Sequence, residues 1–279
     1  MRCGRVWNNR HAGRHAPAAS PPSHPARALV LYEYPLNEGI RTMLRLEQLF
    51  DRLGSLIERD ATIDHHFALF TIFEIMDVAS RADLKADLLK ELERQRLQLE
   101  GYRGNPAIAA SVLESTLGQV DRAHEALHAV QGKVGQSLAA NEWLMSIRSR
   151  IAIPGGTCEF DLPAYYAWQQ QPAARRRTDL QGWVGGLVPL AEALGTMLRL
   201  LRDGGLAQKV VAVGGHFQQR LPEGRHYHLL RLRIDGALGL VPEISGHRLM
   251  VSVRMMRAEP DGRLKAAPED ASFVLTLCG

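Results

Sequence analysis

The chain has 279 residues, which is enough for one large domain or two ordinary ones. Hydrophobic residues make up 46% of it and charged residues 23%, a globular composition that excludes a fully disordered or fibrous protein. The most apolar long window, 183–201, contains Glu192 and Arg199 and is interpreted as a soluble helix, not a membrane span. With no apolar run after the N-terminal arginines, we expect no secretion, no membrane insertion and a cytoplasmic location.

The formal net charge of +4 originates in the N-terminal segment. Residues 1–27 contain five arginines and no acidic residue, so the remaining chain has 29 Lys and Arg against 30 Asp and Glu. That remainder has a net charge of −1 and lacks the basic excess of proteins that coat nucleic acids. We therefore expect no nucleic-acid partner, with a basic-tail nucleic-acid-binding module as an alternative.

The N-terminal part of the chain is expected to pass from disorder to a strand and then to a long helix. Residues 1–28, rich in Pro, Ala, His and Arg, predict a disordered extension. Residues 29–34 form a short extended run that Pro35 stops. Asn37 is expected to cap a helix in which apolar residues recur every three or four positions as far as Ile57.

Helices dominate the next part of the chain. Further helices are predicted at 64–80, 83–102, 108–130 and 141–150. One more is predicted at 175–202, and a cluster of three glycines and Pro189 should break or bend its first half.

Strand patterns follow the helices. Runs with β-branched or alternating residues are predicted as strands at 209–213, 227–235, 248–257 and 272–277. We expect these strands to form an antiparallel meander with one face packed on a core. The turn at 153–156 and the segment 160–162 are expected to belong to the same sheet. The fold class is α+β, with a helical domain at 29–152 and a β-rich domain at 153–279 that contains the inserted helix at about 175–202.

Common catalytic motifs are absent, including the P-loop, the dinucleotide-binding glycine pattern, GxSxG and HExxH. Cys3, Cys158 and Cys278 are far apart and form no CxxC pair, which argues against a disulfide framework and a zinc site. The turn at 155–158 is interpreted as structural, because Cys158 has no identifiable partner base.

The histidines are weak candidates for metal ligands. His65 and His66 point about 100° apart on a helix, so Asp64 beside them is better explained as a helix-start cap. His226 and His228 share a strand face, but a third ligand is not identifiable. We therefore expect no enzyme, metal or cofactor. A small-molecule enzyme would need a pocket around His226, His228, Asp235 or Cys158.

Several arginines stand beside apolar faces and form the candidate binding set. Arg41 and Arg45 lie four apart near the start of the first helix, on the same side. Others follow the predicted strands, at Arg231, Arg233, Arg248, Arg254 and Arg257. Guanidinium groups gathered on one surface of a dimer would suit an acidic peptide, while each alone is explained as an ordinary solvated charge.

Four collinear segments stand out: LYEYPLNEGIRTMLRLE at 31–47, LLKELERQ at 88–95, IPGG at 153–156 with FDLP at 160–163, and ISGH at 244–247. Together they resemble the ZapD family of FtsZ-associated division proteins. The likeness extends from about residue 30 to the end of the chain. It implies a helical domain and a β-rich domain, a homodimer, and no catalytic residues.

The same resemblance implies that the protein binds the C-terminal tail of FtsZ and bundles FtsZ filaments at the division ring. Arg41 and Arg45 match basic positions of the family, and Arg248 and Arg254 match positions in its later part. Arg45 has an alternative role, an ion pair that fixes the first helix to its neighbours. Two departures, Glu142 and Tyr166, stand where some relatives carry Arg and His, which implies a smaller or displaced basic surface.

Overall fold

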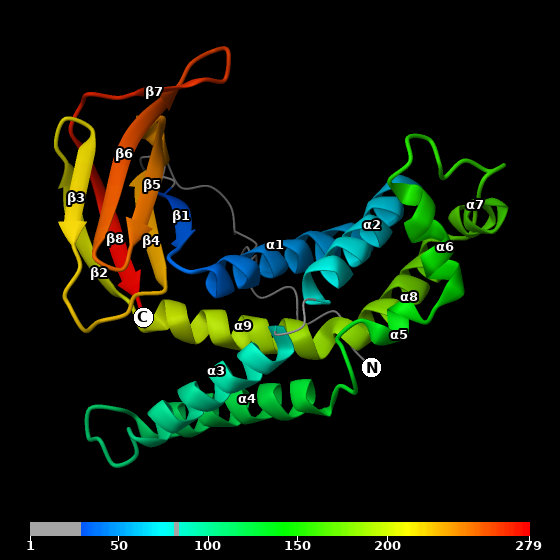
Figure 1. Ribbon diagram of the computed structural model, residues 1–279, viewed down its shortest axis with the longest axis horizontal. Coiled ribbons are helices and arrows are strands. Elements are labelled where there is room, and N and C mark those ends of the chain that lie inside the picture. The colour runs from blue at the N-terminus through cyan, green and yellow to red at the C-terminus, as the bar shows by residue number, and fades with distance from the viewer. Residues whose placement is uncertain (1–28, 81–83) are drawn as a thin grey trace, which may run out of the picture. The chain divides into compact units, whose positions relative to one another are not determined.

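The structure is a computed structural model that describes residues 29–80 and 84–279. These residues form two compact units: unit 1 comprises 45–197, and unit 2 comprises 29–44 with 198–279. Unit 1 is built from helices and unit 2 mainly from antiparallel sheets, which confirms the α+β class (Figure 1). The predicted disorder of residues 1–28 lies outside the described residues.

The long helices agree closely with the predicted segments, whereas the short helices at Gln136–Ala139 and Pro163–Gln169 were not predicted. They are α1 (Glu38–Glu58), α2 (Thr62–Ala79), α3 (Leu84–Glu100), α4 (Ala110–Ala129), α5 (Gln136–Ala139), α6 (Glu142–Ile151), α7 (Pro163–Gln169), α8 (Ala173–Val184) and α9 (Val188–Asp203). A 3₁₀ turn, η2 (Gly185–Leu187), separates α8 from α9 at the predicted glycine cluster. By length and composition alone the stretch Ala173–Asp203 is apolar enough to cross a membrane, a test that the core helix of a soluble protein also passes.

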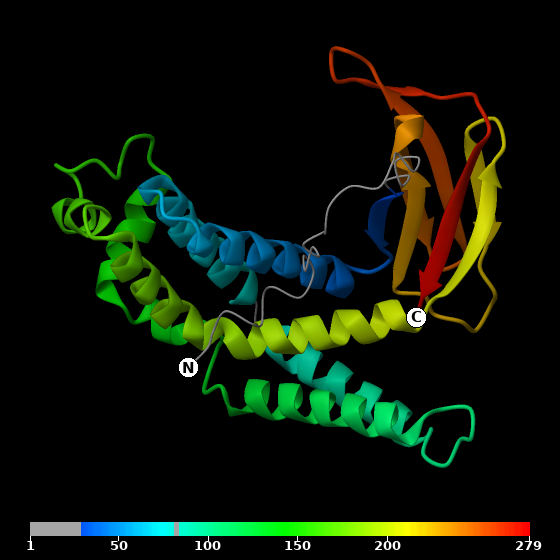
Figure 2. The ribbon, with the colours of Figure 1, turned by 180° about the vertical axis from the view of Figure 1, so that it is seen from behind.

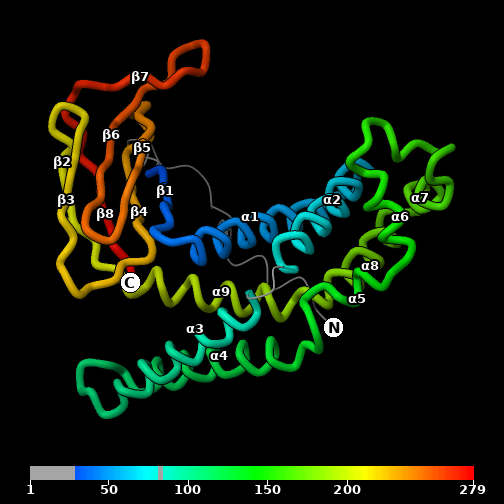
Figure 3. The backbone as a smooth tube through the Cα atoms, in the orientation of Figure 1, coloured from blue at the N-terminus to red at the C-terminus, as the bar shows by residue number. Residues whose placement is uncertain are grey.

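Unit 1 buries its apolar side chains between packed helices. The α3 and α4 helices run side by side, joined by the loop at 101–109 (Figure 3). Four aromatic side chains form a cluster, in which the ring centroids of neighbouring members lie 5.1–6.2 Å apart: Trp143, Tyr165, Trp168 and Trp183. The Trp168 indole donates a hydrogen bond to Asp179 at 3.1 Å, which satisfies its polar atom in this apolar setting.

The segment 153–162 differs from its prediction as part of the sheet. It is a succession of turns within unit 1, and at its end the Leu162 amide donates a hydrogen bond to the Cys158 carbonyl at 2.9 Å. Pro163 follows at the first position of α7, where its fixed φ favours a helix start. The segment therefore leads into a helix and not into a strand.

Unit 2 is a sandwich of two antiparallel sheets. Its strands are β1 (Leu29–Pro35), β2 (Leu206–Ala212), β3 (His216–Arg220), β4 (Leu229–Asp235), β5 (Leu240–His247), β6 (Met250–Ala258), β7 (Leu264–Ala266) and β8 (Ala271–Cys278). Sheet A has the order β1-β4-β8-β2 (Figure 2). Sheet B has the order β3-β6-β5, and β7 also pairs with β6.

The core of unit 2 is formed by the inward faces of both sheets. Leu230, Leu232 and Ile234 of β4 are buried with Val251 and Val253 of β6 in one cluster. The predicted alternation along β4 is confirmed, because Arg231 and Arg233 point to the other face. The antiparallel pairing is likewise confirmed.

The predicted meander is wrong, because consecutive strands change sheets. The β2–β3 hairpin connects sheet A to sheet B through Gly214 and Gly215, both with positive φ. A Cβ atom on Gly215 would lie 1.8 Å from the Ala267 carbonyl oxygen, so glycine is required there. Three strands were also missed, β3, β5 and β7.

The division into units differs from the predicted domain boundary at residue 152. The β1 strand pairs with β4 across some 200 residues and so belongs to unit 2. Residues 153–197 belong to unit 1, and the boundaries between the units fall within α1 and α9.

Candidate functional site

The start of α1 carries the first candidate arginine, Arg41. Asn37 caps the helix as predicted: its Oδ1 accepts a hydrogen bond from the Ile40 amide at 2.9 Å. The side-chain amide of Asn37 also lies 2.9 Å from the Nδ1 atom of His228. Arg41 pairs with Glu38 at 3.1 Å, and its side chain is 39% exposed. It is therefore an accessible cation on a helix turn that unit 2 holds in place.

Arg254 lies at the centre of the outward face of sheet B. Strand register places it between His216 of β3 and Glu243 of β5. Its guanidinium group pairs with the Glu243 carboxylate, and its side chain remains 63% exposed. His216 shares a hydrogen bond with Ser252 at 3.3 Å, so the imidazole is held beside the arginine. Both side chains are exposed and so accessible to a partner.

A second row of the same face adds more cationic and imidazole groups. Arg220 and His247 flank Met250 in register, and both side chains are exposed. Arg248 follows in the turn between β5 and β6, also exposed. We call this surface the basic face and define it by His216, Arg220, His247, Arg248 and Arg254. On the paired rows of β3, β5 and β6 it contains one carboxylate, that of Glu243.

Three members of the basic face were not predicted from the sequence, namely His216, Arg220 and His247. The β3 strand reads HFQQR, which has no apolar alternation. Their common location follows only from the pairing of β3 and β5 with β6.

Two of the other arginines of the predicted strands, Arg231 and Arg257, have structural partners. Arg231 and Arg202 both bind the carboxylate of Glu33, at 2.9 Å and 2.6 Å respectively. The three side chains are at most 17% exposed, so this group is mainly structural. Arg257 pairs with Glu269 and donates to the Leu238 carbonyl at 3.1 Å. Arg233 is exposed on the outward face of sheet A.

Arg45 and the two departures from the family pattern belong to unit 1. Arg45 is exposed and lies one helical turn after Arg41 on α1. Glu142 occupies the first turn of α6, where a carboxylate favours the helix dipole, next to the capping Asn141. Tyr166 lies on α7 and is 44% exposed. The structure thus places Arg41, Arg248 and Arg254 in one unit and Arg45 in the other.

His65 and Asp64, two residues at the start of α2, have structural roles. His65 is fully buried, and its Nδ1 accepts a hydrogen bond from Arg176 at 2.9 Å. Burial, together with the positive charge of Arg176, lowers the pKa of His65. Asp64 does not cap α2: the capping position is Ala61, and Asp64 pairs with Arg59 inside the first turn.

The two cysteines and the paired histidines do not form a metal site. Cys158 and the buried Cys278 are free thiols, and burial raises the pKa of Cys278. Cys3 lies outside the described residues. Within residues 29–80 and 84–279, no group of three or more His, Cys, Asp and Glu side chains is arranged to hold a metal ion.

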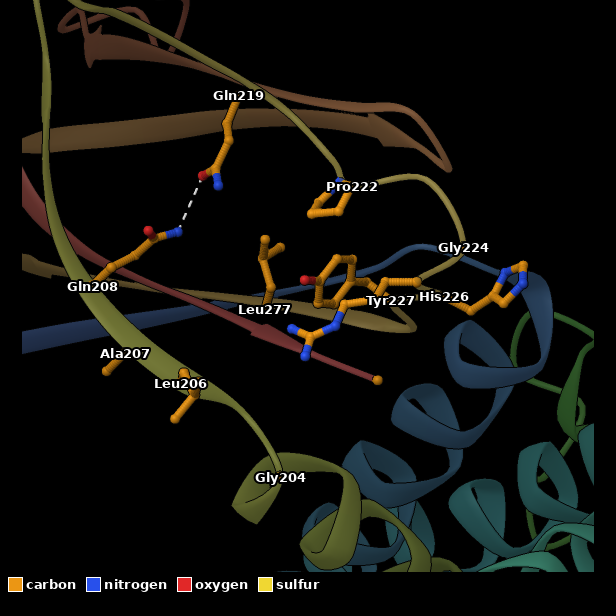
Figure 4. A pocket seen from close by; sticks show the side chains of 12 residues that line it. Gly204, Leu206, Ala207, Gln208, Gln219, Pro222, Gly224, His226, Tyr227 and Leu277 are labelled. Carbon is orange, nitrogen blue, oxygen red and sulfur yellow. Dashed lines mark hydrogen bonds between the residues drawn. The ribbon is translucent and has the colours of Figure 1, made fainter.

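A pocket of about 520 Å³ lies at the end of the sandwich between β2 and β3. Gln208 and Gln219 are joined by a hydrogen bond of 3.1 Å at its far side, and Tyr227 points into it (Figure 4). Of the residues suggested for an enzyme, His226 lines it, whereas His228, Asp235 and Cys158 do not. Its lining, among the residues described, has no carboxylate, hydroxyl or thiol side chain of Asp, Glu, Ser, Thr or Cys beside His226. A nucleophile with its base is therefore not assembled here.

Comparison with known proteins identifies the family. The family model described as "ZapD: Cell division protein" matches residues 44–254. The cell division protein ZapD of Ralstonia pickettii (strain 12J) is 52% identical over 251 residues, which cover 90% of this chain and 99% of that protein. The residues matched by the family model include Arg45, Arg248 and Arg254. This chain belongs to the ZapD family of cell division proteins.

Proposed function

We propose that the protein is a non-enzymatic cell-division factor that binds the C-terminal tail of FtsZ and cross-links FtsZ filaments. It acts in the cytoplasm, at the mid-cell division ring, as a homodimer. Membership of a cell division family supports the cellular role. The basic face supports the mode of binding, and it is the single observation that carries the proposal, because its one carboxylate leaves a net positive surface.

The basic face suits an extended acidic segment. Arg254 lies in one paired row of sheet B, and Arg220 lies in the row that contains Met250, four residues earlier on β6. Guanidinium groups bind carboxylates strongly, often through paired hydrogen bonds, and Arg254 already contacts one carboxylate, that of Glu243. An acidic peptide that lies along β6 would exchange this exposed ion pair for contacts of its own. Arg41 and Arg45 on α1 are the other two arginines of the proposed binding set.

Cross-linking follows from symmetry and valency. A two-fold dimer presents the basic face twice, so one dimer holds two filaments. A filament offers many tails, so weak single contacts add up to strong overall binding. Because the contacts are electrostatic and exposed, binding should weaken as the salt concentration rises.

Charge reversal on β6 tests the assignment of the surface. Arg254→Glu should weaken binding of a fluorescent FtsZ tail peptide about tenfold or more, because it replaces an attraction with a repulsion. Arg257→Glu is the matched control: the residue lies on the same strand, is about half exposed and also pairs with a carboxylate, but it is outside the basic face. Arg45→Glu extends the test to α1. Equal peptide affinity for the Arg254→Glu and Arg257→Glu variants, both folded, would remove the basic face from the site.

A further inference from the structure

Two histidines of α4 stand one helical turn apart with their rings side by side. His124 and His128 have a sequence spacing of four, which places both side chains on the same face of the helix. Their ring centroids lie 6.1 Å apart with an interplanar angle of 14°, so the two imidazoles are nearly parallel. Adjacent helical positions such as His65 and His66 point in different directions. The α4 pair therefore has the mutual placement that those two histidines lack.

The ring nitrogens of this pair are open to a ligand. Across residues 29–80 and 84–279, neither His124 nor His128 forms a hydrogen bond or an ion pair with another described group. The His128 side chain is exposed, and that of His124 is partly buried. A neutral imidazole carries one unprotonated nitrogen and is the commonest metal ligand among side chains. The pair can therefore offer two nitrogen donors to one ion.

Carboxylates lie around the pair and favour a cation. Asp121 and Glu125 each stand three residues before one of the two histidines on α4, the spacing of neighbours on a helix surface. Glu93 belongs to α3, which runs beside α4 (Figure 1). The hydrogen bond from Arg96 lowers the pKa of Glu93, and the nearby His124 imidazole adds to this shift. An ion beside the imidazoles would therefore lie close to negative charge from both helices.

We propose that His124 and His128 form a two-histidine site for a divalent transition-metal ion such as Zn²⁺. Imidazole nitrogens suit Zn²⁺, Ni²⁺ and Cu²⁺, whereas Mg²⁺ and Ca²⁺ prefer oxygen ligands. Two nitrogens that bind one Zn²⁺ at about 2.0–2.1 Å lie about 3–3.5 Å apart. Small rotations about the side-chain bonds bring the facing edges of the rings to this separation, because the rings are already neighbours and nearly parallel.

The site is open, with two protein ligands. Within the described part of the chain, no group of three His, Cys, Asp and Glu side chains is arranged to hold a metal ion, so water completes the coordination. Structural zinc sites have four protein ligands, so the ion binds more weakly and reversibly here. An ion held by both imidazoles joins two successive turns of α4. Because it binds the folded helix better than the unfolded chain, it stabilises the folded protein.

This inference goes beyond the proposed function and does not rest on it. The histidine pair lies on α4 in unit 1, whereas the basic face belongs to unit 2. Binding of the FtsZ tail peptide and binding of Zn²⁺ are separate measurements, so either proposal can fail while the other stands.

Titration calorimetry of the full chain with Zn²⁺ tests the site. Loss of either imidazole leaves a single nitrogen ligand, so His124→Gln and His128→Gln should each weaken Zn²⁺ binding about tenfold or more. Mg²⁺ should give no binding at the same concentrations, because the donors are nitrogens. Equal Zn²⁺ affinity of the wild type and of the variant that carries both substitutions would overturn the inference. A full loss with one single variant and none with the other would contradict an ion shared by the two rings.

A second histidine pair with the same spacing provides the matched control. His11 and His15 are also four positions apart, in the segment outside the described residues. Zn²⁺ should raise the thermal midpoint of the wild type and of the variant in which His11 and His15 are both replaced by glutamine, but not that of His128→Gln. A rise that persists in His128→Gln, or that disappears with the N-terminal pair, would place the ion elsewhere and overturn the inference.

Discussion

Replacing Arg176 with glutamine tests how unit 1 holds the corner between α1 and α2. Arg176 is only 5% exposed, and its guanidinium group binds neutral acceptors from three segments. It donates to the Nδ1 atom of His65 at 2.9 Å, to the Asp60 carbonyl at 2.7 Å, and to the Gln169 and Gln171 carbonyls. One side chain of α8 thus ties the start of α2 and the end of α7 together.

The expected loss of stability follows from these contacts. A hydrogen bond from a charged donor contributes about 1.5–3 kcal/mol, and a buried acceptor left without a partner costs about 1–3 kcal/mol. The variant also avoids burying a cation, which recovers part of that loss. We therefore expect Arg176→Gln to lower the free energy of unfolding by about 3 kcal/mol. Arg175→Gln, on the same helix with a side chain 66% exposed, should cost less than about 1 kcal/mol.

Urea unfolding followed by tryptophan fluorescence measures this difference, because Trp143, Trp168 and Trp183 form one cluster in unit 1. The urea midpoint of Arg176→Gln should fall well below those of the wild type and of Arg175→Gln. Equal midpoints for the two variants would refute the reasoning that the buried guanidinium group holds this corner.

Three further predictions concern stability. Burial lowers the pKa of His65 below 6.5, so at acidic pH the unfolded state binds more protons than the folded state. The free energy of unfolding should therefore be constant above pH 6.5 and fall below it, by up to about 1.4 kcal/mol at pH 5.5. Urea midpoints at both pH values check this, and His65→Gln should reduce the pH dependence; an unchanged slope would count against it. Glu33→Gln should cost about 3 kcal/mol, since it leaves two largely buried arginines without their carboxylate, whereas Glu243→Gln, with a side chain 48% exposed, should cost below about 1 kcal/mol in the same denaturation assay. Asn37→Ala should cost about 1 kcal/mol through the lost cap of α1, and an unaltered thermal midpoint would disprove this role.

Local features of the helices were predictable from the sequence because their causes are local. Asn37 stands immediately before an apolar repeat with a helical period, and it caps α1. The glycines at 185 and 186 interrupt a helical pattern, and a 3₁₀ turn stands there. The alternation of Leu and Arg along β4 correctly assigned its two faces, since a strand has a period of two whatever its neighbours are.

Features that depend on contacts between distant residues were not predictable in the same way. The β5 strand contains Pro242 and Gly246, residues that usually interrupt strands, and it pairs with β6 despite them. The partner of β1 is β4, about 200 residues away, and local patterns carry no information about that pairing. The basic face was incomplete for the same reason, because His216 joins Arg254 only through the register of β3 and β6.

The proposed cross-linking of FtsZ is tested most directly by low-speed co-sedimentation of polymerised FtsZ with this protein. Full-length FtsZ and FtsZ without its C-terminal tail are compared under the same conditions. Bundles that pellet only with full-length filaments, and that disappear with the Arg254→Glu variant but persist with Arg257→Glu, are the expected result. Pelleting of both kinds of filament would contradict recognition of the tail, and pelleting of neither would contradict the proposed cross-linking itself.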